Sequence, residues 1–104
     1  MRAETLKGHL DGLILATLAA GPAHGYAVID ELKQRSGGAF DLPEGTVYPV
    51  LHRLEAEGLL ASEWSEGAGR RRRVYRLTRR GRSSLEGRRN EWRRFAGAVE
   101  AVLG

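Results

Sequence analysis

Residues 45–54 read Gly-Thr-Val-Tyr-Pro-Val-Leu-His-Arg-Leu, and this stretch decides the fold. Val47, Leu51 and Leu54 recur at i, i+4 and i+7, the spacing of one buried face of a helix. Pro49 is expected in the first turn, where a missing N–H does little harm because the first helical N–H groups have no intrahelical partner. The stretch therefore predicts a helix with one apolar side and one side open to solvent.

The open side of this helix carries side chains suited to contacting DNA, namely Thr46, Tyr48, Pro49, His52 and Arg53. The major groove admits one helix whose N-terminal residues touch base edges, and a helix N-terminus also favours a phosphate. Two alternatives stay open: Tyr48 can pack against the preceding helix, and Arg53 can pair with Glu57 one turn later.

The helix is expected to run from Glu44 to Glu57 and to end in a left-handed cap at Gly58. A hairpin follows it. Residues Leu60–Glu66 alternate as a strand, and Arg72–Leu77 form the return strand. Between them, Gly67-Ala68-Gly69 and the first arginines make the predicted tip.

Four successive arginines mark this hairpin: Arg70, Arg71, Arg72 and Arg73. They point to both faces of the ribbon, so about half of them can meet one phosphate backbone at once. Their predicted role is to bind DNA phosphates whatever the base sequence, with an affinity that falls as the salt concentration rises. A reading helix followed by a basic hairpin is the outline of a winged helix-turn-helix.

Two helices are predicted before the reading helix, over Leu6–Ala20 and His24–Arg35, so the fold class is mainly α with a small β-hairpin. In the second of them, Tyr26, Ile29 and Leu32 are expected to face inward.

The last predicted helix starts after an N-cap at Thr78 and runs to Leu103. Its residues Leu85, Trp92 and Val99 are spaced by seven, as in a coiled-coil seam. From periodicity alone, packing onto the same subunit and pairing with a second subunit are equally good interpretations. The small size of the chain favours pairing.

Charge is divided unevenly along the 104 residues, whose net charge is +4. Residues 1–66 hold five Lys/Arg and ten Asp/Glu, whereas residues 67–104 hold twelve Arg and three Glu. This asymmetry favours an anionic partner for the C-terminal part, nucleic acid before a charged membrane surface. A merely solvated arginine-rich face is the other interpretation.

Other classes of function find little support. Cysteine is absent, which excludes disulfides and cysteine-bound zinc. His9, His24 and His52 lie on separate segments without metal-ligand spacing, and no phosphate-binding loop or nucleophile elbow occurs. Without a long apolar run or a signal peptide, we expect a cytoplasmic protein that spans no membrane, holds no cofactor or metal and is not an enzyme.

Several segments stand in a specific order and spacing: His24–Tyr26, Glu44–Glu55, Gly58-Leu59, and Arg71–Thr78 followed by Gly81. Together they resemble the PadR-like family of bacterial transcriptional regulators over nearly the whole chain. The resemblance implies a winged helix-turn-helix homodimer that represses transcription from double-stranded DNA at a palindromic operator. With one helix after the hairpin, the chain is similar to the short subfamily, in which that helix makes the dimer.

The resemblance also implies a small-molecule effector, because family members often release DNA on binding a phenolic acid or a hydrophobic drug. In short members the pore lies between subunits and is lined by the first and last helices. Trp92 matches in kind the tryptophans of that pore, and Leu10, Ile14, Phe95 and Val99 are expected to complete an apolar lining. An aromatic or hydrophobic ligand is expected, with the alternative that Trp92 only fills the dimer core.

Taken together, residues 1–78 are expected to form the DNA-binding domain and residues 79–104 the dimerisation helix. The predicted function is a sequence-specific, homodimeric repressor. The main alternative is a winged-helix module that binds protein or RNA without an operator.

Overall fold

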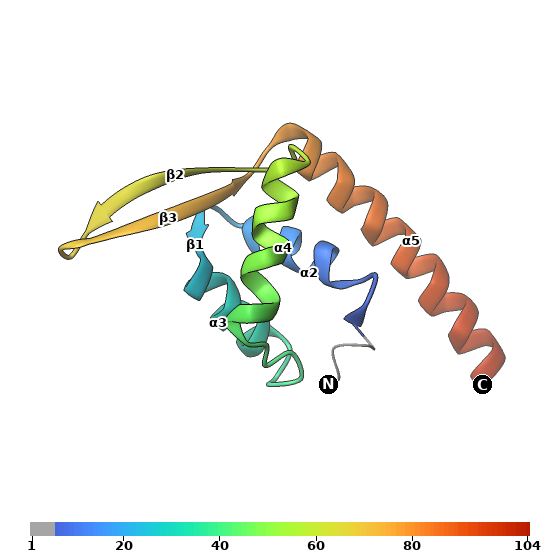
Figure 1. The fold of residues 1–104 in the computed structure, drawn as a ribbon. Coiled ribbons are helices and arrows are strands. Elements are labelled where there is room, and N and C mark those ends of the chain that lie inside the picture. Colours follow the sequence, from blue (N-terminus) through green and yellow to red (C-terminus); the bar gives the residue numbers. More distant parts are fainter. Residues whose placement is uncertain (1–5) are drawn as a thin grey trace.

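The computed structural model describes residues 6–104 and arranges them in four helices and a three-stranded antiparallel sheet. The elements are α2 (Leu10–Leu18), β1 (Ala23–His24), α3 (Gly25–Arg35), α4 (Glu44–Ala56), β2 (Leu60–Gly67), β3 (Arg70–Leu77) and α5 (Arg79–Leu103). In Figure 1 the β2–β3 hairpin extends to one side of α4 and α5 extends to the other. The predicted fold class, a winged helix-turn-helix followed by a C-terminal helix, is confirmed.

The apolar stripe of α4 lies in the core, as its spacing predicts. Val47, Leu51 and Leu54 are fully buried. A period of i, i+4 and i+7 places three side chains on one face of a helix, and that face packs against the other elements. The core is completed by Leu6, Ile14, Leu15, Leu18, Val28, Leu32, Leu42, Leu60, Tyr75, Leu77 and Leu85.

Both predicted helix caps around the hairpin are confirmed. Gly58 follows α4 with a φ of 80°, and the N–H of Leu59 donates to the carbonyl of Leu54 at 2.9 Å. This is the Schellman arrangement, which needs a residue that tolerates the left-handed region. Before α5, the Thr78 hydroxyl accepts from the N–H of Gly81 at 3.0 Å. The hairpin therefore lies between the capped C-terminus of α4 and the capped N-terminus of α5.

The hairpin turns more tightly than the sequence suggested. Gly67 pairs with Arg70, so only Ala68 and Gly69 form the turn, with φ values of 52° and 75°. Positive φ at both central residues is what a type I′ turn requires, and this turn matches the twist of the flanking strands. The prediction that Arg70 and Arg71 lie in the tip is wrong, because a two-residue turn lets β3 start at Arg70.

Two features of the predicted helices are also wrong. The helix predicted over residues 6–20 is shorter, since α2 runs from Leu10 to Leu18; Gly8 before it has a φ of +88°, which an α-helix does not contain. Pro49 lies in the second turn of α4 rather than the first. It therefore removes the N–H that would otherwise bond the carbonyl of Gly45.

In the second helix, Leu32 is buried and Ile29 packs against the core as expected, but the inward placement of Tyr26 is wrong. It begins at Gly25, with His24 in a short strand, β1, that pairs with β3. Val28 and Leu32 are buried, whereas Tyr26 is 60% exposed. Because Gly25, Val28 and Leu32 recur at i, i+3 and i+7, they define the inner face, and Tyr26 lies off it.

α5 rests on the rest of the chain through its first turns. Gly81 and Leu85 are its buried residues, while Trp92 and Phe95 are 52% and 56% exposed. The helix then continues along the edge of a molecule whose longest dimension is 53 Å. Over residues 6–104, no helix is both long and apolar enough to cross a membrane.

Tyr75 buries a hydroxyl that has no hydrogen-bond partner among residues 6–104. Replacing Tyr75 with Phe is expected to change the free energy of unfolding by less than about 1 kcal/mol at neutral pH, since no bond is lost. Burial, aided by the charge of Glu55, raises the pKa of Tyr75 above the ordinary value of 10.0. The folded state thus holds this proton more tightly than the unfolded state.

It follows that the wild-type protein loses stability as the pH rises above about 10, and that the Phe variant loses less. Urea unfolding of both proteins at pH 8 and pH 11 measures the difference. Equal losses in the two proteins would contradict the assignment to Tyr75.

Candidate nucleic-acid interface

The most exposed side of α4 carries no carboxylate, lysine or arginine. It consists of a row of four residues, which we call the outward ridge: Gly45, Pro49, His52 and Ala56. All four are exposed, and no side chain or backbone atom lies within 4 Å of where a Cβ on Gly45 would stand. Because these side chains are exposed and Gly45 has none, the backbone of α4 can come close to a binding partner on this side. Of the predicted DNA contacts, Pro49 and His52 belong to it.

Tyr48 borders the outward ridge on the side of the hairpin and is half-buried. Its ring packs on α3 at Gly25, where an added Cβ would stand 2.5 Å from the ring Cζ. The ring also meets Tyr26 and His52 edge-on, with centroids 6.3 and 6.4 Å away. Burial raises the pKa of Tyr48. The packing against α3, which the sequence allowed as an alternative, is therefore present, and it still leaves Tyr48 partly accessible.

Glu44 at the start of α4 lies near Tyr26 of α3. Its carboxylate, as a hydrogen-bond acceptor and as a negative charge, raises the pKa of the Tyr26 phenol. The phenol is therefore neutral at physiological pH and remains a hydrogen-bond donor on the exposed surface. The sequence alone did not indicate either residue as part of this surface.

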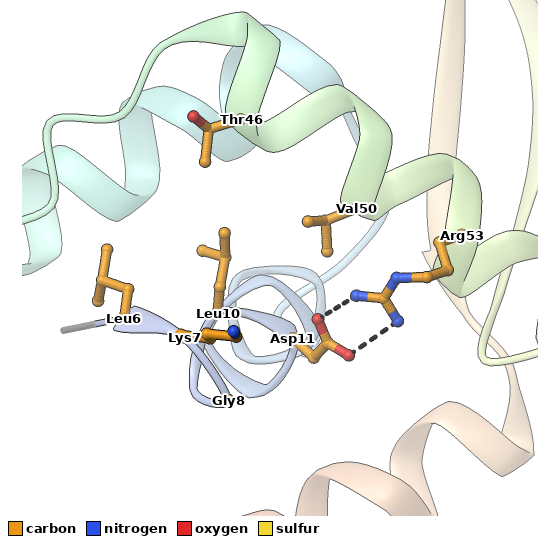
Figure 2. Close-up of a pocket in the computed structure, with 8 residues that line it drawn as sticks. All are labelled: Leu6, Lys7, Gly8, Leu10, Asp11, Thr46, Val50 and Arg53. Carbon is orange, nitrogen blue, oxygen red and sulfur yellow. Dashed lines mark hydrogen bonds and ion pairs between the residues drawn. The ribbon is translucent and has the colours of Figure 1, made fainter. Parts of the chain in front are cut away.

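Arg53 and Thr46 border the outward ridge on the opposite side, towards α2. Figure 2 shows the Arg53 guanidinium reaching from α4 to the carboxylate of Asp11. The two contacts, at 2.6 and 3.1 Å, form a bidentate pair, and Glu57 adds a third at 3.3 Å. The hydrogen bond to Asp11 is the main reason that the pKa of Arg53 is raised. Thr46 and Val50 line the same pocket of about 380 Å³.

The wing, meaning the hairpin of β2 and β3, presents its four arginines on two faces. Opposite residues of an antiparallel pair share a face, and neighbours along a strand alternate. Arg71 lies opposite Glu66, and Arg73 lies opposite Trp64. Their guanidinium carbons stand 4.7 and 5.3 Å from the Trp64 ring, so both stack on it.

Arg73 also ties the wing to α4. Its Nε donates to the Ser62 hydroxyl at 2.7 Å, and its Nη2 lies 3.4 Å from the carboxylate of Glu55. The Ser62 hydroxyl in turn donates to Glu55. This face of the wing is therefore both anchored and electrically balanced, since Glu55 and Glu66 offset Arg73 and Arg71.

The other face of the wing carries Arg70 and Arg72, opposite Gly67 and Ser65, and further along it Arg76 and Glu63. Arg72 Nη1 lies 2.9 Å from Nε2 of His24, a residue without a negative charge. No carboxylate pairs with either arginine within residues 6–104. This face holds three arginines and one carboxylate, whereas Glu55 and Glu66 offset the two arginines of the first face, so the net positive charge of the wing is concentrated on the Arg70–Arg72 face.

A groove of about 860 Å³ runs between α2 and α5. Trp92 and Phe95 line it, and His9 meets the Trp92 ring edge-on with centroids 5.2 Å apart. The other three residues expected for a ligand pore are placed differently. Ile14 is fully buried in the core, Leu10 lines the pocket next to α4, and Val99 lies further along α5.

Comparison with known proteins identifies the family. Residues 14–87 match the profile described as the transcriptional regulator PadR-like family. The chain belongs to this family. The transcriptional regulator Rv3488 of Mycobacterium tuberculosis is 47% identical over 72 residues, which are 69% of this chain and 64% of that protein, slightly under two thirds of its length.

Solved structures of PadR-family regulators agree with this assignment. One from Clostridium difficile R20291 has a TM-score of 0.84 and 34% identity, covering 93% of this chain and all of that one. One from Eggerthella lenta DSM 2243 has a TM-score of 0.83 and 35% identity, covering 96% and 86%. The PadR-like chain is therefore a transcriptional regulator with a winged-helix fold, and its family consists of DNA-binding regulators rather than enzymes.

Sequence reasoning missed several residues that shape this PadR-like surface. Gly25 was noted only as part of a motif, although the Tyr48 ring occupies the space that a side chain would need. Asp11 and Glu55 were not noted as partners of Arg53 and Arg73. Asp11 lies in the first turn of α2, far from Arg53 in the sequence, so no local pattern reveals the pair.

Proposed function

We propose that this PadR-like protein is a homodimeric repressor that reads a palindromic operator in the cytoplasm and is released by a small aromatic or hydrophobic ligand. The observation that supports this most is the outward ridge of α4, which is exposed and carries no carboxylate, lysine or arginine. It lies beside a wing with a net positive face, that of Arg70 and Arg72. The ridge suits close approach to base edges, and the wing suits phosphates. Residues 1–78 act as the DNA-binding unit and residues 79–104 as the dimerisation helix.

Within this interface, the predicted contacts divide by position. Pro49 and His52 face the bases, with the imidazole as a hydrogen-bonding group. Tyr48 and Thr46 flank them and reach the sugar–phosphate backbone. Arg53 is the least available of the predicted set, because two carboxylates already hold it.

The unpartnered face of α5 supports the dimer. Its exposed apolar residues are Trp92, Phe95, Val102 and Leu103. An exposed apolar surface of this kind, bordered by charged residues, marks an association site. Leu85, the first residue of the predicted seven-residue stripe, is buried in its own subunit, which leaves Trp92 and Val99 of that stripe for a second copy of the same helix. Two-fold symmetry then sets the two reading helices near one turn of DNA apart, about 34–36 Å.

The groove between α2 and α5 supports the ligand. Its volume of about 860 Å³ lies within the range of small-molecule sites. Its apolar lining includes Leu13, Trp92 and Phe95. Arg88 and Arg89 at its border are paired with Asp11 and Glu86, and Glu91 also lines the groove, so a neutral aromatic compound suits it. In the dimer this groove adjoins the partner helix, so a ligand there acts on the arrangement of the two subunits.

Selection from a library of random DNA duplexes tests the proposal, because it finds an operator whatever its sequence. We expect enrichment of a two-fold symmetric sequence. In fluorescence anisotropy, the selected duplex should bind at least about a thousandfold more tightly than its scrambled version. No enrichment, with equal and strongly salt-sensitive binding of all duplexes, would refute sequence-specific regulation. Tighter binding of RNA than of any duplex would favour the alternative module.

The two faces of the wing predict different salt dependence. The double variant R70Q/R72Q is expected to reduce the slope of log affinity against log salt by about two units, one for each lost phosphate contact. The matched variant R71Q/R73Q removes the same charge from the face that Glu55 and Glu66 balance. It is expected to change the slope by less than about one unit. Titrations of the selected duplex at several salt concentrations give both slopes, and a larger change in R71Q/R73Q would reverse the assignment of faces.

A further inference from the structure

The carboxylate of Asp11 lies where three helices meet. It stands in the first turn of α2, where the helix dipole favours a negative charge. On one side it holds Arg53 of α4, and on the other it lies 3.7 Å from Nη2 of Arg88 in α5. Within residues 6–104, no other carboxylate forms ion pairs with two different helices.

The contact with α4 is the stronger of the two. The guanidinium of Arg53 and the carboxylate of Asp11 meet through two parallel hydrogen bonds, as drawn in Figure 2. Such paired bonds fix orientation as well as distance. The Asp11 side chain is only 21% exposed, so water screens it less than an ordinary surface carboxylate.

The contact with α5 is fixed by packing around Arg88. The Arg88 side chain runs over Gly12, with its Cδ 3.3 Å from where a Cβ on Gly12 would stand. Its Nε donates to the Ser84 hydroxyl at 3.2 Å. Arg88 also lines the groove between α2 and α5, so Asp11 connects that groove to the DNA-reading helix.

We propose that Asp11 is a positioning residue for DNA recognition, which sets α4 relative to α5 through Arg53 and Arg88. The proposal rests on the DNA-binding function proposed above and assigns Arg53 to structure rather than to DNA contact. Arg53 faces Asp11 and Glu57, so its charge is already balanced before DNA arrives. A balanced arginine adds little to counterion release.

The direction in which DNA affinity changes makes this assignment testable. If Arg53 contacted a phosphate, removing Asp11 would free it and tighten DNA binding, whereas removing Arg53 would weaken binding. If the pair positions α4, both changes weaken binding. The double change should then cost no more than either single change, because the two residues act as one unit.

The experiment compares D11N, R53Q and D11N/R53Q on the selected operator, with E57Q as the matched control. E57Q also removes one negative charge that lies beside Arg53. It breaks no contact between helices, because Arg53 and Glu57 lie one turn apart at the end of α4. We expect D11N, R53Q and the double variant each to lose about tenfold in affinity, with an unchanged salt slope, and E57Q to stay within about twofold of wild type. Tighter binding by D11N, or a slope reduced by about one unit in R53Q, would overturn the proposal.

A second measurement needs no DNA and separates failure of this proposal from failure of the DNA-binding function. In ¹H–¹⁵N NMR spectra of the folded protein, D11N should shift backbone amides both around Arg53 in α4 and around Arg88 in α5. E57Q should shift only those of α4. Shifts confined to α2 in D11N would overturn the positioning role, whether or not an operator is found. Circular dichroism confirms that each variant is folded.

Discussion

Replacing Gly81 with Ala is expected to lower the free energy of unfolding by about 3 kcal/mol, because among the glycines of residues 6–104 an added Cβ meets its nearest backbone atom here. An added Cβ would overlap the carbonyl oxygen of Leu59 and stand 3.1 Å from Leu77 Cδ2. The oxygen belongs to backbone that Gly58 holds in its cap, and it also accepts from the N–H of Thr78 at 3.2 Å. α5 must therefore move away from the body of the protein.

The matched control is Gly87→Ala in the same helix, where nothing lies within 4 Å of the added Cβ. There the substitution is expected to stabilise the protein by about 0.5–1 kcal/mol, because Ala has the higher helix propensity. Thermal unfolding at one protein concentration measures both, with a midpoint lowered by at least about 10 °C for Gly81→Ala. A midpoint equal to that of the wild type would mean that α5 is not seated against Leu59.

Replacing Trp92 and Phe95 together with Ala is expected to weaken operator binding by at least about a hundredfold. If α5 makes the dimer, their loss removes the centre of the interface, where aromatic residues carry most of the binding energy. A monomer binds one half-site and loses the effective concentration that links the two reading helices. Sedimentation equilibrium gives the subunit association, and anisotropy with the full operator and a half-site duplex gives the DNA affinity.

Trp64→Ala provides the control for this pair, since Trp64 is 54% exposed, close to the 52% of Trp92, but lies on the wing. It should leave the protein dimeric. A W92A/F95A variant that sediments as a dimer would show that the subunits associate through another surface. A monomer that still binds the full operator as tightly as wild type would separate DNA recognition from dimer formation.

Local patterns were sufficient to predict most of the fold. The stripe of Val47, Leu51 and Leu54 follows from the helical period alone. The caps follow from residue type, because Gly58 tolerates a positive φ and the Thr78 hydroxyl can accept a hydrogen bond from a backbone N–H. Each of these signals acts over a few residues. For that reason the order of elements and the core face of α4 followed from the sequence directly.

Features that depend on contacts between segments far apart in the sequence could not be predicted from local patterns. The two-residue strand β1 exists because β3 lies beside it, and nothing in Ala23-His24 alone indicates a strand. On α3 only Tyr26 was misplaced, because Gly25, which has no side chain and so adds nothing to an apolar pattern, continues the buried face of Val28 and Leu32. The Asp11–Arg53 pair joins elements far apart in the chain, so only the packed structure could locate it.

The junction between the wing and α5 has a consequence for the DNA sites that this protein can use. Thr78 alone separates the last residue of β3 from the first of α5. Its N–H and its hydroxyl donate to the carbonyls of Leu59 and Gly58, in the turn that follows α4. In the proposed dimer, the two wings are thus joined through rigid helices without a hinge. Such a dimer binds only operators with one separation between half-sites. Each added base pair rotates the second half-site by roughly 34–36° about the DNA axis, away from the second reading helix.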